Sequence, residues 1–298
     1  MDNEMKILEK EFSPSEWAKR FATADETIER HKKVIMEGTN LARETLECVL
    51  DIAYDKGPRS KLDVYGMDLP DDAPVFVIFH GGYWQIEEYT KEMGTYGVIP
   101  LVRAGCRVIV VDYEMCPTVT LSELVSKIYD CINFTLCHAK IKDAKFINFI
   151  GHSAGAHLIM CQCIMARFVN LTHNYLIKDI YLLSGVYDLR DLRFTQAANK
   201  NNLLSINETN LVTLSPALYD FEHIPMEGLL SIRFTVIAAE NDSPSFISMS
   251  EDMAEALKKG NAIVNYMLLP NSDHFEIVEQ LNDENGTLMK MMLKNLYQ

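Results

Sequence analysis

This sequence lacks the features of a membrane protein and of a nucleic-acid-binding protein. No apolar run approaches the ~18 residues that a helix needs to cross a bilayer. The start, MDNEMKILEKEF, has no basic stretch followed by an apolar one, so no secretory signal is visible and we expect a cytoplasmic location. Basic residues number 28 against 42 acidic ones, a formal net charge of −14. Because nucleic acids and anionic membrane surfaces would repel such a chain, neither is an expected partner.

Metal-binding patterns are also missing. The seven cysteines do not show the spacing of a zinc finger or ribbon. Cys161 and Cys163 stand two residues apart in an expected helix, so their side chains point to different faces. Reduced, buried thiols are therefore expected, and the sequence predicts neither a metal site nor a cofactor.

What the sequence does contain is a regular alternation of strand and helix patterns. Apolar runs such as VFVIF and VIVV suit strands that are covered on both faces. Strands alternating with helices imply βαβ units, so we predict the α/β class with a mostly parallel central sheet flanked by helices. The expected strands are 46–53, 61–67, 74–79, 107–111, 145–150, 179–183, 233–239 and 262–269, and the expected helices are 90–104, 121–136, 244–259 and 275–296.

Two segments depart from this alternation, although a single domain over residues 1–298 is expected. Residues 1–45 are polar and helix-prone, and form either a cap over the body or a loosely attached arm. Residues 190–228 contain polar clusters and short apolar pieces. We interpret them as a cap-like insertion over the carboxyl ends of the strands, where it would serve as a lid or pocket wall.

A possible nucleophile lies in the motif Gly151-His-Ser-Ala-Gly155. It follows the apolar run KFINFI and precedes a long apolar segment, HLIMCQCIMARF, expected as a buried helix. G-x-S-x-G between a strand and a helix is typical of the nucleophile elbow of α/β-hydrolases. Its glycines let the backbone turn sharply, so the hydroxyl of Ser153 projects into the site. The alternative is an ordinary strand–helix loop.

A serine nucleophile needs a base to take its proton, usually a histidine. In α/β-hydrolases the histidine comes last in the chain, after the carboxylate. His274 follows the last expected strand and precedes the last expected helix, which favours it as the base. The other candidate, His223, lies inside the irregular insertion, where a surface role is more natural.

The carboxylate that orients the histidine should follow the preceding strand. Asp242 and Glu240 both do so, and Asp242 suits the loop position from which a side chain can reach sideways. The alternative role for Asp242 is to cap the next helix. Asp273 is an unlikely partner because the side chains of neighbouring residues diverge.

An acyl-transfer site also needs donors for the oxyanion of the tetrahedral intermediate. His80-Gly81-Gly82 follows the third expected strand, and glycines there let backbone amides face the site. Gly81, Gly82 and Ala154, the residue after the nucleophile, are the predicted donors. His80 is expected to brace this loop through hydrogen bonds. A simple turn is the alternative.

Four segments together resemble the kynurenine formamidases (arylformamidases), a family of the α/β-hydrolase superfamily. They are EFSPSEW at 11–17, HGGYW at 80–84, VDYEMCPTVTL at 111–121 and GHSAGAHL at 151–158. HGGYW departs from the HGGG of hormone-sensitive-lipase-like esterases. The resemblance implies an enzyme that hydrolyses N-formyl-L-kynurenine to formate and L-kynurenine in tryptophan breakdown. It also implies that Ser153, Asp242 and His274 form the triad.

The implied substrate is an aryl formamide with a zwitterionic amino-acid tail. Tyr83 and Trp84 beside the oxyanion loop could stack on its ring, or could instead pack against the cap. A homodimer is compatible with the sequence. Two other functions stay open: a carboxylesterase for small acyl esters, and a non-catalytic binding protein on the same scaffold.

Overall fold

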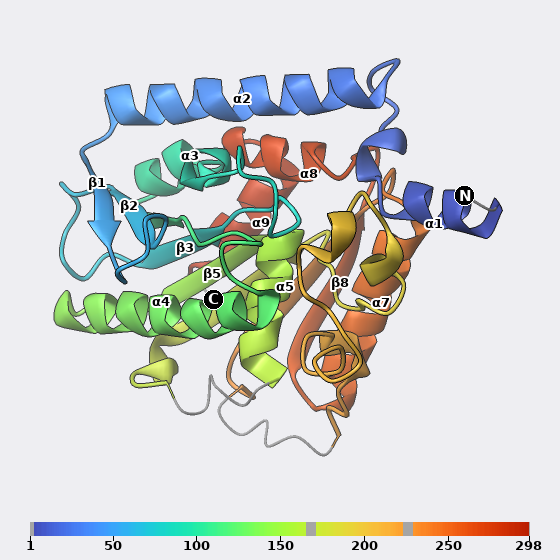
Figure 1. Cartoon of the computed structure of the whole chain (residues 1–298). Coiled ribbons are helices and arrows are strands. Elements are labelled where there is room, and N and C mark those ends of the chain that lie inside the picture. The colour runs from blue at the N-terminus through green and yellow to red at the C-terminus, as the bar shows by residue number, and fades with distance from the viewer. Residues whose placement is uncertain (1–2, 165–170, 223–228, 298) are drawn as a thin grey trace.

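A computed structural model describes residues 3–164, 171–222 and 229–297 of the chain, and its centre is an eight-stranded sheet (Figure 1). The strands are β1 (Cys48–Ala53), β2 (Lys61–Tyr65), β3 (Val75–Phe79), β4 (Arg107–Val111), β5 (Ile147–His152), β6 (Ile177–Leu183), β7 (Arg233–Ala239) and β8 (Ile263–Leu269). Their order is β1-β2-β4-β3-β5-β6-β7-β8. β2 pairs antiparallel with both β1 and β4, and all other pairs are parallel. Every expected strand is present, with ends that differ by no more than two residues.

Helices flank this sheet as predicted. α3 (Val98–Arg103), α8 (Glu276–Glu279) and α9 (Thr287–Asn295) lie toward one side, and α4 (Leu121–Ile141) and α5 (Ala154–Ile164) toward the other (Figure 1). α7 (Pro244–Lys259) packs against β7 and β8. The short 3-10 helices are η1 (Pro14–Glu16), η2 (Lys91–Gly94), η3 (Asn174–Leu176), η4 (Leu192–Phe194), η5 (Lys200–Asn202), η6 (Pro216–Leu218) and η7 (Gln280–Asn282). No helix within the described ranges is both long and apolar enough to cross a bilayer.

The core lies around the middle strands. Every residue of β3, β4 and β5 is buried, because helices cover both faces of the parallel strands. β1 and β8 form the edges and are partly exposed. The carboxyl ends of the buried strands therefore form a rigid rim, on which loops can be placed accurately.

Two expected helices are interrupted. The expected helix 90–104 is split into η2 and α3, because Gly97 adopts a left-handed φ of 73° and its amide donates to Asn282 instead of continuing a helix. The expected helix 275–296 ends early in α8 and η7, and α9 begins only after Gly286, because Asp283 is extended. Glycine and the short polar residues supply turns that the apolar periodicity does not reveal.

The N-terminal segment packs on the body. α2 (Ala24–Thr45) crosses the molecule above α3 and α8, and α1 (Asn3–Glu11) lies beside α7 (Figure 1). Ile35 and Ala42 of α2 are fully buried. Residues 3–45 thus have the contacts of a packed cover and not those of a loose arm, and we refer to them below as the N-terminal cover.

Candidate active site

Ser153 lies at a sharp turn between β5 and α5. Its φ is 52°, a left-handed value that serine rarely adopts, and its amide donates to Leu183 of the neighbouring strand β6. A Cβ on Gly155 would lie 2.2 Å from the Phe79 carbonyl oxygen, and one on Gly151 would lie 2.6 Å from the Ala156 nitrogen. Both flanking glycines are therefore required by close backbone contacts, and they hold the serine at the rim of the sheet.

His274 is held by a buried carboxylate. Its Nδ1 lies 2.7 Å from Oδ2 of Asp242, and both side chains are almost fully buried. The other oxygen of Asp242 accepts the Ser243 amide at 2.9 Å. Because a carboxylate only accepts, Nδ1 of His274 carries the proton and Nε2 is left with a lone pair. An imidazole in this tautomer can act as a general base.

His152 fixes the same loop from the other side. Its Nε2 lies 2.8 Å from the carbonyl oxygen of His274. Burial lowers the pKa of His152 well below its usual value, so the ring is neutral and Nε2–H donates to that carbonyl. Sequence reasoning missed this residue, although it stands inside the elbow motif. His274 is thus constrained at both its ring and its backbone.

The competing carboxylates and histidine are placed differently. Glu240 is exposed and accepts the amide of Asn271. Asp273 accepts hydrogen bonds from Arg20 and not from the His274 ring. The side chain that caps α7 belongs to Ser243, so the capping interpretation of Asp242 is wrong. The alternative base, His223, lies outside the described residues.

The predicted oxyanion loop has a backbone path that needs glycine. Gly82 has a φ of 112°, and a Cβ there would lie 2.8 Å from Cβ of Tyr89. A Cβ on Gly81 would lie 3.0 Å from Nδ1 of His152. Among the loop and cap hydrogen bonds of the described residues, none uses the amide of Gly81, Gly82 or Ala154 as its donor. These three amides are therefore free to bind an anionic oxygen.

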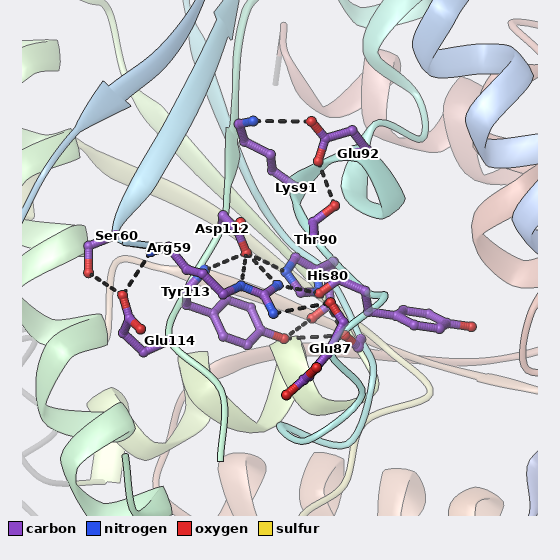
Figure 2. Close-up of polar contacts among 12 residues, drawn as sticks. Arg59, Ser60, His80, Glu87, Thr90, Lys91, Glu92, Asp112, Tyr113 and Glu114 are labelled. Atoms are coloured by element: carbon purple, nitrogen blue, oxygen red, sulfur yellow. Dashed lines mark hydrogen bonds and ion pairs between the residues drawn. The ribbon is translucent and has the colours of Figure 1, made fainter. Parts of the chain in front are cut away.

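His80 braces this loop from behind, as Figure 2 shows. Its Nδ1 lies 2.7 Å from the carbonyl oxygen of Gly81. The His80 ring stacks on Tyr113 with centroids 4.3 Å apart, and the Tyr113 hydroxyl donates to the His80 carbonyl at 2.7 Å. Nε2 of His80 faces Oδ1 of Asp112 at 3.6 Å. The loop is held by groups from two strand ends, β3 and β4.

Arg59 ties a second part of the same loop to Asp112, and neither residue was found from the sequence. The guanidinium donates to Oδ1 of Asp112 at 2.8 and 3.1 Å (Figure 2). It also donates to the carbonyl oxygen of Glu87 at 3.3 Å and to that of Tyr89 at 2.5 Å. One arginine from the β1–β2 connection therefore fixes both backbone groups that flank Glu88.

A cavity of about 320 Å³ opens at these groups, near the lower end of the range for small-molecule sites. Its walls come from the N-terminal cover, the oxyanion loop, the elbow, the His274 loop and the insertion. The lining residues are Phe12, Ser13, Pro14, Ser15, Ile28, Lys32, Gly82, Tyr83, Ile86, Tyr89, His152, Ser153, Ala197, His274 and Phe275. Ala197 is the contribution of the expected 190–228 insertion, whose residues 223–228 lie outside the described part.

Tyr83 and Trp84 differ in their relation to the cavity. Tyr83 lines it, and its hydroxyl donates to the Phe12 carbonyl of the N-terminal cover at 2.9 Å. Trp84 is fully buried, is absent from the lining described above and packs edge-on against His157 with ring centroids 4.6 Å apart. Trp84 is therefore placed as a core residue, because the left-handed turn at 83–84 directs it inward, and not as a ring that stacks on substrate.

Ion pairs anchor the N-terminal cover to the loop that carries His274. Arg20 binds Asp273 at 2.6 Å and Glu279 at 2.6 Å, and His31 lies 3.0 Å from Glu279. Burial alone would raise the pKa of Glu279, but hydrogen bonds from His31 and Arg20 outweigh it and lower that pKa to about 2. Within the described ranges, no group of three or more His, Cys, Asp or Glu is placed to hold a metal ion.

Comparisons with known proteins agree with this architecture. Residues 76–277 match a family model described as the alpha/beta hydrolase fold. A solved structure of esterase B from Lactobacillus rhamnosis superposes with a TM-score of 0.69 at 14% identity, covering 99% of this chain and 95% of that one. Kynurenine formamidase from Drosophila melanogaster is 33% identical over 92% of each chain. That from Danio rerio is 32% identical over 96% of this chain and 94% of its own length. The chain therefore belongs to the kynurenine formamidase family of the α/β-hydrolases, as its motifs predict.

Proposed function

We propose that this protein hydrolyses N-formyl-L-kynurenine to formate and L-kynurenine, as a serine hydrolase with Ser153, His274 and Asp242 as its triad. The observation that carries the proposal is the buried hydrogen bond between His274 and Asp242 at a cavity that Ser153 also lines, in a chain of the formamidase family. Nucleophile, base and orienting carboxylate come from the ends of different strands, the arrangement that acyl transfer requires.

The first half-reaction forms a formyl-enzyme. Nε2 of His274 takes the hydroxyl proton of Ser153 as the oxygen attacks the formyl carbon. The carbonyl electrons move to oxygen, where the amides of Gly81, Gly82 and Ala154 stabilise the oxyanion. On collapse the C–N bond breaks, and His274 delivers its proton to the departing aniline nitrogen. L-kynurenine leaves.

The second half-reaction uses water. His274 takes a proton from water, whose oxygen attacks the formyl ester carbon. The bond to the Ser153 oxygen then breaks, and that oxygen receives the proton from His274. Formic acid leaves and ionises. Asp242 retains its charge throughout and keeps the Nδ1–H tautomer, which stabilises the imidazolium formed in each half-reaction.

Steady-state kinetics of the purified protein test this proposal. The value of kcat/KM for N-formyl-L-kynurenine, followed by absorbance of the aniline product, is expected to exceed that for simple acyl esters such as nitrophenyl acetate. A value no greater than the ester background would favour a small-acyl carboxylesterase. Ser153→Ala is expected to lose on the order of 10⁶-fold in kcat. Unchanged turnover of this variant would exclude the serine as nucleophile.

A further inference from the structure

The residues that line the cavity differ in charge from the chain as a whole. The protein has a formal net charge of −14, with 42 acidic residues. Among the residues that line the cavity in the described part of the chain, none is acidic and only Lys32 is a lysine or arginine. A cationic side chain in a lining without carboxylates attracts an anionic part of a ligand. The lining therefore offers one cationic contact and no carboxylate to a ligand.

Lys32 does not stand alone. Its ammonium contacts Oε2 of Glu88, which lies next to the lining residue Tyr89. The Lys32 hydrogen bond lowers the pKa of Glu88, so that carboxyl group is ionised at neutral pH. The Lys32 side chain is 37% exposed and the Glu88 side chain is 69% exposed. Each therefore has positions left for another partner, since an ammonium has three donors and a carboxylate about four acceptor sites.

The pair is also held in place. Arg59 binds the backbone carbonyl of Glu87 (Figure 2) and that of Tyr89, on either side of Glu88. Lys32 projects from α2, which is anchored through His31 to Glu279. An exposed ion pair contributes little to stability. The backbones that carry one positive and one negative group are thus held next to each other, and the fold does not depend on the pair.

We propose that Lys32 and Glu88 bind the amino-acid tail of the substrate, with Lys32 contacting the α-carboxylate and Glu88 contacting the α-ammonium. This inference rests on the proposed function, because it places the formamide of the same molecule at Ser153. Lys32, the α-carboxylate, the α-ammonium and Glu88 then form a ring of alternating charges. Both residues keep their mutual contact while each gains a new one. The pair selects zwitterionic aryl formamides over neutral ones.

The test compares two substrates across matched variants. N-formyl-L-kynurenine carries both tail charges, whereas N-(2-acetylphenyl)formamide keeps the aryl formamide and the ketone but lacks them. Lys32→Gln is expected to raise KM for formylkynurenine about tenfold, the effect of one charge-assisted hydrogen bond in a partly exposed site. The kcat for formylkynurenine and both constants for the neutral substrate should stay close to wild type.

Control variants separate recognition from general damage. Lys33→Gln removes a neighbouring lysine that is 65% exposed and paired with Glu37, and it should leave both substrates unaffected. Lys32→Arg keeps the charge and should restore most of the preference. Glu88→Gln should raise KM for formylkynurenine about threefold, a smaller change because this side chain is 69% exposed.

The outcomes are distinguishable. An active wild-type enzyme whose substrate preference is unchanged by Lys32→Gln overturns the tail-binding role alone. The same follows if Lys32→Gln weakens both substrates equally. A wild-type protein that does not turn over formylkynurenine overturns the proposed function, and the inference with it.

Discussion

Replacing Asp242 by asparagine tests the orientation of His274. The Ser243 amide donates to Oδ1 of Asp242, and His274 lies at Oδ2. In Asp242→Asn the amide oxygen is needed as the acceptor for Ser243, so the NH₂ group faces Nδ1 of His274. An NH₂ group can only donate, so Nδ1 must become the acceptor and the imidazole proton moves to Nε2. The base then has no lone pair toward Ser153.

The expected loss in kcat is on the order of 10⁴-fold, which corresponds to about 5.5 kcal/mol of transition-state stabilisation. Size and shape are conserved, so the far-ultraviolet circular dichroism spectrum and the Tm should stay near those of wild type. Formylkynurenine hydrolysis is measured under single-turnover conditions, because turnover is then too slow for steady-state assays. Glu240→Gln, a nearby exposed carboxylate, is the matched control and should retain activity.

The reasoning would be refuted by a folded Asp242→Asn variant with kcat within tenfold of wild type. It would also be refuted if Glu240→Gln caused the larger loss, because the orienting carboxylate would then be the exposed one.

Two further predictions concern the supports of the site. Arg59→Met frees the 87–89 backbone and removes the guanidinium from Asp112, so kcat should fall on the order of 10²-fold and KM for formylkynurenine should rise, because the freed backbone carries Glu88; both are measured by steady-state kinetics. An unchanged kcat would contradict the role of this contact. Because the pKa of Glu279 is lowered to about 2 from an ordinary 4.5, its contribution to stability is complete above about pH 4.5 and is lost as the pH falls toward 2. Thermal unfolding should show a smaller drop in Tm over this pH range for Glu279→Gln than for wild type, and equal drops would exclude this group.

The strands could be predicted because buried parallel strands appear as continuous apolar runs. Val75–Phe79 and Arg107–Val111 are examples whose bounds the sequence indicates almost directly. The helix expected at 90–104 is present only in two pieces, 91–94 and 98–103, because Gly97 adopts a left-handed conformation and its amide binds a distant partner, Asn282. Apolar periodicity identifies a buried face but does not show where tertiary contacts interrupt it.

In the candidate site, too, residues in local motifs could be predicted, whereas residues that act through distant contacts could not. Ser153, His274 and Asp242 stand in motifs or at strand ends, so their order along the chain makes them candidates. Arg59 donates a hydrogen bond to Asp112, which lies 53 residues further along the chain, and no local sequence pattern predicts that contact. The N-terminal cover could not be assigned from residues 1–45 either, since an amphipathic helix does not specify what it packs against.

The anchoring of Arg20 on Asp273 has a consequence for how the enzyme matures. The two residues are 253 positions apart, so during translation the arginine is made long before its acceptor. The N-terminal cover and the loop that carries His274 can therefore pair only when the polypeptide is nearly finished. An incomplete chain that stops short of this loop lacks these ion pairs, although the contacts of the cover with Tyr83 and Glu88 can already form.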